Sequence, residues 1–425
     1  MQLINNKTNI PLILKVAIGN FIEWYDFYVY SATSIYFASQ FFPSNGDKVL
    51  ELLKSASVFF IGFLMRPIGA WIFGSIADKH GRRFSILIAV ALMGASAFLT
   101  AILPTYTTIG IWSALFLSIF RMMQGLSAGG QYGSIAAYIS ESSIKGKGCF
   151  YASFQAMTLV IGMLGASLVV YFLSHILTDA QLQNWGWRIP FFVGAIISVI
   201  GFIIQSGLNE KTHPESKSNI PAGSITVLFR DYKKIFFLVS GYTAAGSLTF
   251  YTFTTYMRSY LYTTTGFNKE ATQSIVVAAL FIYMICLPFF GWLGDRIGTR
   301  ACLRWWSGIS IFIVIPMLKI IGTTHSYFTA FICIVILLLV SALYYAVSNI
   351  VKAEMYPSNI RALGVSLSHA VANAIFGGSA SMVALYFKNI GIGYVFSYYV
   401  TFMLMIAAFS AWYMPDARKY SDLYK

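Results

Sequence analysis

The sequence predicts an all-α membrane protein with twelve transmembrane helices in two pseudo-symmetric six-helix bundles. Three observations predict this fold class: a composition too apolar for a soluble protein, twelve apolar runs, and a charge motif that recurs in each half. Of the 425 residues, 57% are hydrophobic and 10% are charged, whereas soluble proteins have about 25% charged residues. With a mean hydropathy of +0.69, the chain lacks the polar surface that a soluble globule needs.

The apolar runs are long enough to cross a bilayer, since a helix needs roughly 20 residues to span a core of about 30 Å. In chain order, the expected spans are 16–42, 49–77, 84–103, 108–139, 148–176, 188–207, 235–263, 270–293, 302–321, 327–351, 362–387 and 391–414. A long polar gap, 209–224, follows the sixth span. We therefore expect an N-terminal bundle (1–207), a cytoplasmic linker (208–230) and a C-terminal bundle (231–425).

The distribution of basic residues predicts the orientation. If both termini are cytoplasmic, the inside segments hold 20 of the 29 Lys and Arg residues, among them Lys352, and the outside segments hold 7, among them Arg258. The other two, Arg66 and Arg121, lie within spans. This asymmetry satisfies the positive-inside rule. It also explains the net charge of +14 without a nucleic-acid partner, because the basic residues form no stripe on a soluble domain.

Two charge motifs recur at nearly the same offset. "GSIADKHGRR" (74–83) follows the second span and "GWLGDRIGTR" (291–300) follows the eighth, with Asp78 and Asp295 217 positions apart. After the fourth and tenth spans, Glu141 and Glu354 are 213 positions apart. The recurrence predicts a duplicated six-helix unit. Transporters built from such repeats hold their substrate between the repeats, near the bilayer midplane.

The first span carries two acids in "GNFIEWYDFYVYSATS" (19–34). Counted from Lys15 at 1.5 Å per residue, Glu23 lies about 12 Å and Asp26 about 16 Å into the membrane, on the same helix face as Tyr30. Two acids so close do not both ionise cheaply. We expect them either to carry a proton or to pair with intramembrane arginines.

Arg66 and Arg121 are the cations within the first-half spans. A guanidinium binds a carboxylate through two hydrogen bonds. These arginines either neutralise the two acids or bind an anionic substrate. Our hypothesis joins both roles: the substrate competes for the arginines, and a proton then settles on a released carboxylate.

Polar residues in other spans offer substrate ligands. Span seven is rich in hydroxyl groups, including Tyr251 and Thr254, and span five contains Gln155. In span eleven, His369 and Asn373 are four residues apart and share a helix face. The alternative is that these groups only bond helices together. His369 also offers a second place for a proton.

Several motifs resemble those of the major facilitator superfamily: "GSIADKHGRR" its loop 2–3 signature and "RMMQGLSAGGQYG" (121–133) its fourth-helix motif. "GNFIEWYDFYVY", "GFLMRPIGAWIFG" and "GWRIPFF" are similar to its metabolite:proton symporters. Within this group, the α-ketoglutarate:proton symporters are similar to two segments of the second half, "GYTAAGSLTFYTFTTYM" (241–257) and residues 351–380. The resemblance covers about residues 15–410.

This resemblance implies the major facilitator fold and roles for particular residues. Arg121 occupies the motif position associated with proton coupling, and Gln124 in the same motif is a further substrate candidate. Gln131 stands where the family usually has an acid, so coupling is expected to depend on Glu23 and Asp26. Inter-helix salt bridges in the cytoplasmic loops are expected to gate alternating access, with Asp78, Arg82, Arg83, Glu141, Asp295, Arg300, Glu354 and Arg361.

The function so implied is proton-coupled import of a small carboxylate, α-ketoglutarate or a related dicarboxylate, across the inner membrane. We expect a monomer in the lipid bilayer that is driven by the proton gradient and needs no cofactor or metal. A proline/betaine symporter is the alternative, although the heptad tail of its osmosensing members is missing here. A membrane enzyme or a channel is a further alternative. The sequence has no zinc, hydrolase or ATP-binding motif, and its duplicated gate motif favours alternating access.

Overall fold

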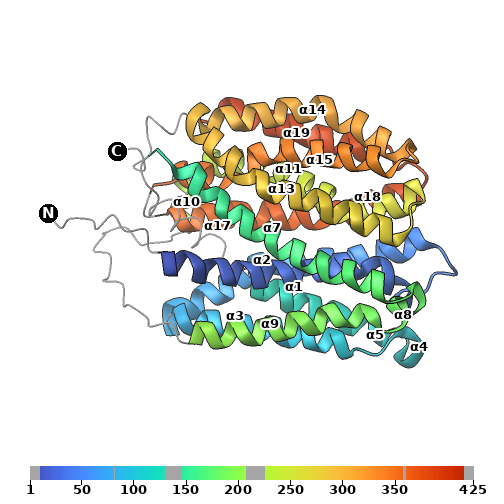
Figure 1. The fold of residues 1–425 in the computed structure, drawn as a ribbon. Helices are drawn as coiled ribbons and strands as arrows, with labels where there is room; N and C mark the ends of the chain where they lie inside the picture. The colour runs from blue at the N-terminus through green and yellow to red at the C-terminus, as the bar shows by residue number, and fades with distance from the viewer. Residues whose placement is uncertain (1–9, 81, 130–145, 207–224, 358–359, 416–425) are drawn as a thin grey trace.

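The computed structural model describes residues 10–80, 82–129, 146–206, 225–357 and 360–415. Throughout this part the chain is helical and contains no strand. Figure 1 shows two groups of long, roughly parallel helices lying side by side, the first half of the chain in one group and the second half in the other. This arrangement confirms the predicted fold class.

In the part of the chain that the structure describes, the N-terminal group has six long helices, and short helical turns lie at one end of the group (Figure 1). Its elements are α1 (Ile10–Phe41), α2 (Lys48–His80), α3 (Arg82–Ile102), α4 (Tyr106–Ile109), α5 (Trp112–Ala128), α7 (Gly148–Ile176), α8 (Asp179–Asn184), η1 (Gly186–Arg188) and α9 (Ile189–Ser206).

The C-terminal group repeats the plan, but some of its helical stretches change geometry along their length. Its elements are α10 (Ile225–Asp231), α11 (Lys233–Tyr251), η2 (Thr252–Tyr256), α12 (Met257–Tyr260), η3 (Leu261–Thr265), α13 (Lys269–Ile297), α14 (Thr299–Thr323), α15 (Tyr327–Tyr345), α16 (Ser348–Glu354), α17 (Arg361–Ala372), η4 (Asn373–Gly377), α18 (Gly378–Asn389) and α19 (Val395–Tyr413). The elements η2, η3 and η4 are π-helical turns. Helix α10 begins inside the predicted linker.

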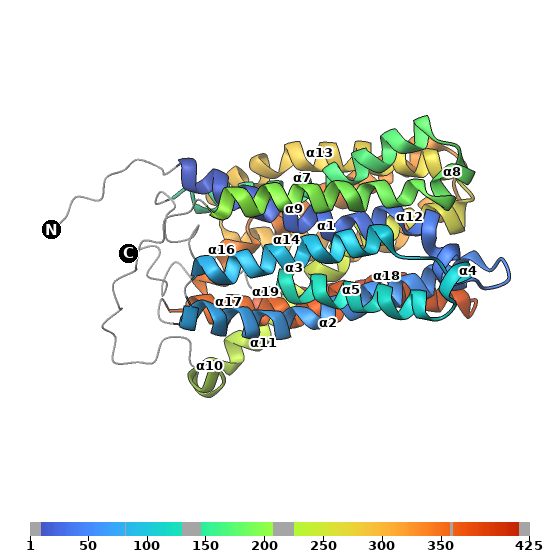
Figure 2. The same cartoon turned by 90° about the horizontal axis from the view of Figure 1, so that it is seen from below.

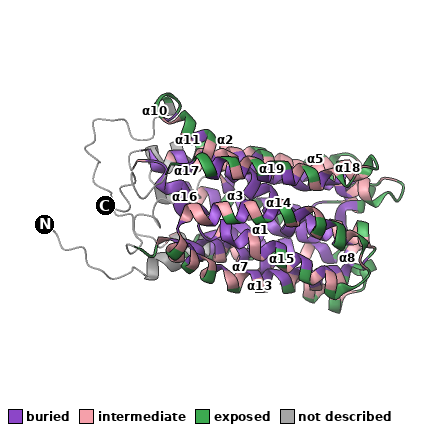
Figure 3. Cartoon of the chain, turned by 90° about the horizontal axis from the view of Figure 1, so that it is seen from above, coloured by how far each residue is buried: buried purple, intermediate pink, exposed green. Residues whose placement is uncertain are grey.

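The polarity of the bundle is that of a membrane protein. Large apolar side chains face outward, such as Trp71 (72% exposed) and Phe312 (79% exposed), whereas Arg121 and Arg258 are fully buried. Figure 3 shows the buried residues gathered along the inner faces of the helices. Eight described helical stretches are long and apolar enough to cross a membrane by themselves. Helix α1, which carries Asn20, Glu23 and Asp26, is not among these eight stretches.

The two halves meet along two seams, which are formed by α7 with α13 and by α2 with α18. Figure 2 shows the same helices from a second direction. Small residues allow the close approach: a Cβ on Gly291 would lie 2.7 Å from Cβ of Ser153, and a Cβ on Gly378 would lie 2.4 Å from Cβ of Phe63. These seams enclose the centre of the molecule from two sides.

Candidate functional site

A cavity lies between the halves and encloses about 460 Å³ of non-atom space, open solvent included. Its polar lining comes from α1, α7, α16, α17 and η4. The polar lining residues are Asn20, Gln155, Ser348, Asn349, His369 and Asn373. No acidic residue is among the described residues that line it.

Three hydrogen bonds organise this polar lining. Nδ2 of Asn349 donates to Oε1 of Gln155 at 2.9 Å, which joins the C-terminal half to the N-terminal half. Nδ2 of Asn20 donates to Oγ1 of Thr158 at 2.8 Å and to the carbonyl of Gln155 at 3.2 Å. Gln155, His369 and Asn373, which the sequence offered as substrate ligands, all lie in the cavity wall. Asn20 and Asn349 were missed, although a lone amide in an apolar span was the available signal.

Aromatic residues form the rest of the wall. Trp24 of α1 faces Phe250 and Tyr251 of α11, and Tyr345 of α15 lies beside them. The rings of Trp24 and Phe250 meet edge to face across the halves, with centroids 6.4 Å apart. Tyr251 was predicted as a ligand, and its phenol is at the cavity. The lining thus combines amide and hydroxyl groups with broad apolar faces, which is typical of a small-molecule site.

Arg66 of α2 lies behind this wall. It is only 5% exposed, and its guanidinium carbon is 4.2 Å from the ring centroid of Phe27, 4.4 Å from that of Phe63 and 5.4 Å from that of Trp24. Its Nε and Nη2 have no hydrogen-bond partner among the described residues. Buried donors without partners cost free energy, so this cation is poised to bind an anion.

Arg121 of α5 is fully buried and is held more closely within the N-terminal half. It donates to Oε1 of Gln124 and, through Nη2, to the carbonyl of Phe27 at 3.4 Å. Its guanidinium lies 4.4 Å from the ring centroid of Tyr30. Nε2 of Gln124 has no partner among the described residues. Neither residue lines the cavity.

Glu23 and Asp26 are buried, with 7% and 2% exposure. Oδ2 of Asp26 accepts a hydrogen bond from Ser198 of α9 at 2.9 Å. No described carboxylate lies within 4.0 Å of Arg66 or Arg121, but Glu23 interacts electrostatically with Arg66, as Asp26 does with Arg121. The acids and arginines therefore form one cluster without direct ion pairs.

Two predicted ligands lie away from the central cavity. The Tyr30 hydroxyl donates to the carbonyl of Ser55 at 2.9 Å and lines a second, smaller space of about 300 Å³. Thr254 is fully buried and donates to the carbonyl of Phe250 at 2.7 Å. The structure does not bring either hydroxyl group to the central cavity.

Lys352 was counted among the cytoplasmic charges, but the structure buries it. Its side chain is 1% exposed, and its Nζ lies 3.1 Å from Nδ1 of the cavity residue His369. The missed signal was helical spacing: Ser348 and Asn349 lie three and four residues before Lys352, on one side of α16. A cation therefore stands directly behind the C-terminal wall.

Arg258 was counted as an outside charge, and the structure shows that it is fully buried between the halves. It donates to the Tyr28 hydroxyl at 3.0 Å, to Oγ of Ser167 at 2.6 Å and to Oε1 of Gln273 at 3.2 Å. Nε2 of Gln273 then donates to the carbonyl of Ala32 at 2.9 Å. The network ties four helical segments together. Its position inside the predicted span 235–263 was the signal that charge counting overlooked.

Among the predicted gating residues, Asp295 connects the halves. Its two carboxylate oxygens accept from the backbone N–H groups of Cys149 at 2.8 Å and Phe150 at 3.0 Å, at the start of α7. Backbone N–H groups at a helix start favour an anion.

The other described gating residues bind within the C-terminal half. Glu354 accepts from Thr299 at 3.1 Å, Arg300 donates to the carbonyl of Trp412 at 2.6 Å, and Arg361 donates to the carbonyl of Ala353 at 3.1 Å. The side chains of Asp78, Arg82, Arg83, Gln131 and Glu141 lie outside the described part. Within that part, no cluster of His, Cys, Asp and Glu could hold a metal ion.

Comparison with known proteins agrees with this architecture. The family model "Sugar (and other) transporter" matches residues 12–211, and the model "Major Facilitator Superfamily" matches residues 239–423. A D-xylose-proton symporter of known structure superposes with a TM-score of 0.75 at 16% identity, over 97% of this chain and 99% of that one.

Curated relatives narrow the group. The alpha-ketoglutarate permease of Escherichia coli (strain K12) is 46% identical over 95% of this chain and 93% of its own length. A citrate-proton symporter of Salmonella typhi is 31% identical over 86% of this chain and 84% of its own. A putative proline/betaine transporter of Staphylococcus haemolyticus is 29% identical over 96% of this chain and 87% of its own length. The chain therefore belongs to the major facilitator superfamily, within its proton-coupled metabolite symporters, and is a transporter.

Proposed function

We propose that the protein imports α-ketoglutarate or a related dicarboxylate together with protons across the bacterial inner membrane. The observation that carries this proposal is Arg66: a buried cation beside the cavity wall, with two N–H donors that lack partners. A substrate carboxylate would satisfy those donors and balance the charge. The 46% identity to a permease named for α-ketoglutarate supports the same substrate.

Proton coupling is proposed to use the cluster of Glu23, Asp26 and Arg121. A carboxylate arriving at Arg66 weakens the electrostatic support that Arg66 gives Glu23. A proton then neutralises an acid that the buried site disfavours as an anion. The proton gradient supplies the energy, so no cofactor is needed, and one chain is a sufficient unit.

Alternating access is proposed to break the contacts at the two ends of the cavity in turn. The Arg258 network holds one end and the Asp295 contact with α7 holds the other. With both termini cytoplasmic, Asp295 lies on the cytoplasmic side. Arg300, Glu354 and Arg361 brace the C-terminal half there, and Asp78, Arg82, Arg83 and Glu141 complete the proposed gate.

A proline/betaine symporter is the second candidate, because of the aromatic lining. Trp24, Phe250, Tyr251 and Tyr345 surround the cavity, and aromatic faces attract quaternary ammonium groups. The putative proline/betaine transporters among the relatives fit this reading.

Transport by the purified protein in liposomes tests the proposal. We expect radiolabelled α-ketoglutarate to accumulate under an inward proton gradient and the accumulation to collapse with a protonophore. Liposomes without protein and an Arg66→Gln variant are the controls, and the variant should lose most uptake. Accumulation of proline or betaine without α-ketoglutarate would refute the dicarboxylate assignment.

A further inference from the structure

We propose that Lys352 and His369 form the binding unit for the second carboxylate of the substrate. This inference rests on the proposed function and names the residues that make the site prefer dicarboxylates over monocarboxylates. His369 contacts the substrate, and Lys352 is a positioning residue that acts through His369. Both residues lie in the C-terminal half, opposite Arg66.

The contact between the two side chains fixes the tautomer of the imidazole. Nζ of Lys352 lies 3.1 Å from Nδ1 of His369. When Lys352 is an ammonium, which has three donors and no acceptor, Nδ1 accepts the hydrogen bond and carries no proton. The imidazole proton then resides on Nε2. His369 is therefore a neutral donor in this arrangement, polarised by the ammonium group behind it, and is unsuited to carry a second proton.

The position of His369 makes this donor available to a ligand. The residue lines the cavity from α17, and Asn373 lies one turn further on in η4 and lines the same cavity. An imidazole N–H and an amide N–H side by side offer two hydrogen bonds to one carboxylate. Arg66 and His369 are close enough to interact electrostatically across the halves. A substrate with a carboxylate at each end would connect the two.

Charge balance requires a second cation near the cavity. Arg66 can neutralise one carboxylate, and burying another without a partner costs several kcal/mol. The described lining contains no Lys or Arg. Lys352 is only 1% exposed. It supplies the positive charge through its contact with His369, which lines the cavity. A monocarboxylate would bring no second negative charge to this side of the cavity.

A purely structural role would give a different result. If the contact between Lys352 and His369 only held α16 against α17, its loss would weaken the binding of all ligands to a similar degree. If the pair binds the second carboxylate, its loss would weaken only dicarboxylates. The ratio of affinities for α-ketoglutarate and 2-oxobutyrate separates the two cases, because 2-oxobutyrate has the 2-oxo acid group but no second carboxylate.

The experiment compares full-length wild type, Lys352→Met, Lys352→Arg and His369→Ala. Affinities are measured from the ligand-dependent rise in melting temperature of the purified protein, and KM values from liposome uptake. Hydrogen bonds to charged groups contribute about 1.5–3 kcal/mol, so we expect K352M and H369A to lower the affinity ratio about tenfold or more. K352R should largely keep it. Lys388→Met is the matched control, since Lys388 bonds Thr263 and Thr264 away from the cavity.

Each outcome decides the inference. An affinity ratio that falls in K352M and H369A, with 2-oxobutyrate affinity unchanged, supports it. A parallel loss of both affinities, or an unchanged ratio, overturns it. H369A decides the matter if K352M does not fold. Failure of the proposed function would show in the wild type itself, which would then bind no dicarboxylate.

Discussion

The two halves of the molecule bring different side-chain chemistry to the interior of the molecule. The N-terminal half buries four charged side chains in the regular helices α1, α2 and α5: Glu23, Asp26, Arg66 and Arg121. The C-terminal half presents hydroxyl, amide and imidazole groups to the cavity, among them Tyr251. The C-terminal half also buries cations, among them Arg258 and Lys352. The difference is that the N-terminal half groups its acids and arginines in one cluster, whereas the C-terminal half lines the cavity with hydrogen-bonding groups.

The halves also differ in backbone geometry. The described π-helical turns η2, η3 and η4 all lie in the C-terminal half. Tyr251 immediately precedes η2 and Asn373 begins η4, and both line the cavity. Such turns are rare and occur frequently at functional sites, because the extra residue redirects side chains. We infer that the acids of the N-terminal half handle the proton, whereas the C-terminal half adapts to a substrate that Arg66 holds from the other side. Damage to each half should therefore have its own signature.

The largest effect is expected from Asp26→Asn in the N-terminal half. An amide oxygen can still accept from Ser198, which lies 2.9 Å from Oδ2 of Asp26, so the fold should survive. The side chain can no longer take up a proton. We expect gradient-driven accumulation to fall at least about tenfold while substrate exchange across the membrane persists, because a lost coupling step affects accumulation only. Accumulation and counterflow in the same liposomes measure the two.

Asp47→Asn is the matched control. Asp47 precedes α2 and accepts from the backbone N–H groups of Val49 and Leu50 in its first turn. It lies outside the charged cluster, and the Asn variant should leave transport unchanged. Glu23→Gln tests the neighbouring acid. If accumulation survives in both D26N and E23Q, the acids are structural and the division of labour between the halves is wrong.

Sequence reasoning located the buried acids of the N-terminal half better than the buried cations of the C-terminal half. Glu23 and Asp26 were predictable because an acid in an apolar run has few alternatives to a buried functional position. Arg258 was misplaced because charge counting uses position along the chain, whereas its burial depends on Tyr28 and Ser167 in the other half. Lys352 was misplaced for the same reason.

The sequence patterns did not predict the π-helical turns of the backbone. The π-helical turns arise within runs whose periodicity is that of an ordinary helix, so no residue pattern marks them. Candidate gating residues such as Asp295 were recognisable from the repeat. Their partners were not, because the backbone N–H groups of Cys149 and Phe150 carry no signature in the sequence.

A smaller effect of a different kind is expected from Gly377→Ala in the C-terminal half. A Cβ on Gly377 would lie 2.7 Å from Oδ1 of Asn373 and 2.8 Å from Cδ2 of Tyr251. Both cavity residues must shift, and small misplacements of ligands weaken binding strongly. We expect KM for α-ketoglutarate to rise on the order of tenfold, with accumulation at saturating substrate preserved. Uptake at varied substrate concentration measures both quantities.

Gly308→Ala controls for the substitution itself. A Cβ on Gly308 of α14 meets no atom within 4 Å, so this variant should behave as wild type. A G377A variant that keeps its KM but loses accumulation would place proton coupling in the C-terminal half and contradict the comparison.

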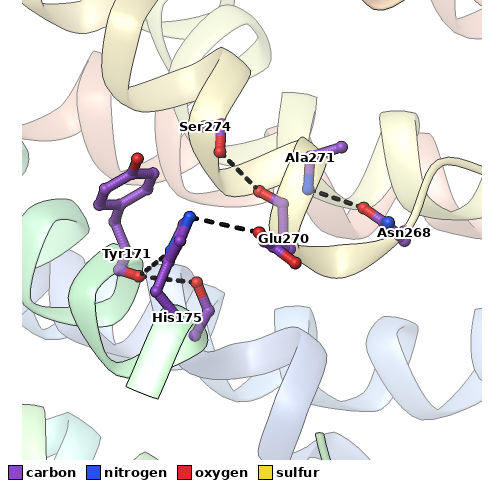
Figure 4. A network of polar contacts seen from close by, with 7 residues as sticks. Tyr171, His175, Asn268, Glu270, Ala271 and Ser274 are labelled. Atoms are coloured by element: carbon purple, nitrogen blue, oxygen red, sulfur yellow. Dashed lines mark hydrogen bonds and ion pairs between the residues drawn. The ribbon is translucent and has the colours of Figure 1, made fainter. Parts of the chain in front are cut away.

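The smallest effect is expected at the surface of the seam between the halves. Nε2 of His175 in α7 lies 3.2 Å from Oε1 of Glu270 in α13, and their side chains are 40% and 56% exposed. Figure 4 shows the pair beside the start of α13, where Asn268 accepts from the backbone of Ala271. Water screens such a pair, and exposed pairs contribute about 0–1 kcal/mol.

Glu270→Gln should therefore change uptake by less than about twofold, and the difference should disappear in high salt because ions screen exposed charges. Uptake at low and high ionic strength checks this. The less exposed contact of Asp295 with α7, which is partly buried, joins the same two helices near their other end. A tenfold loss in E270Q that persists in high salt would show that the surface of the seam, and not its buried contacts, controls the movement of the halves.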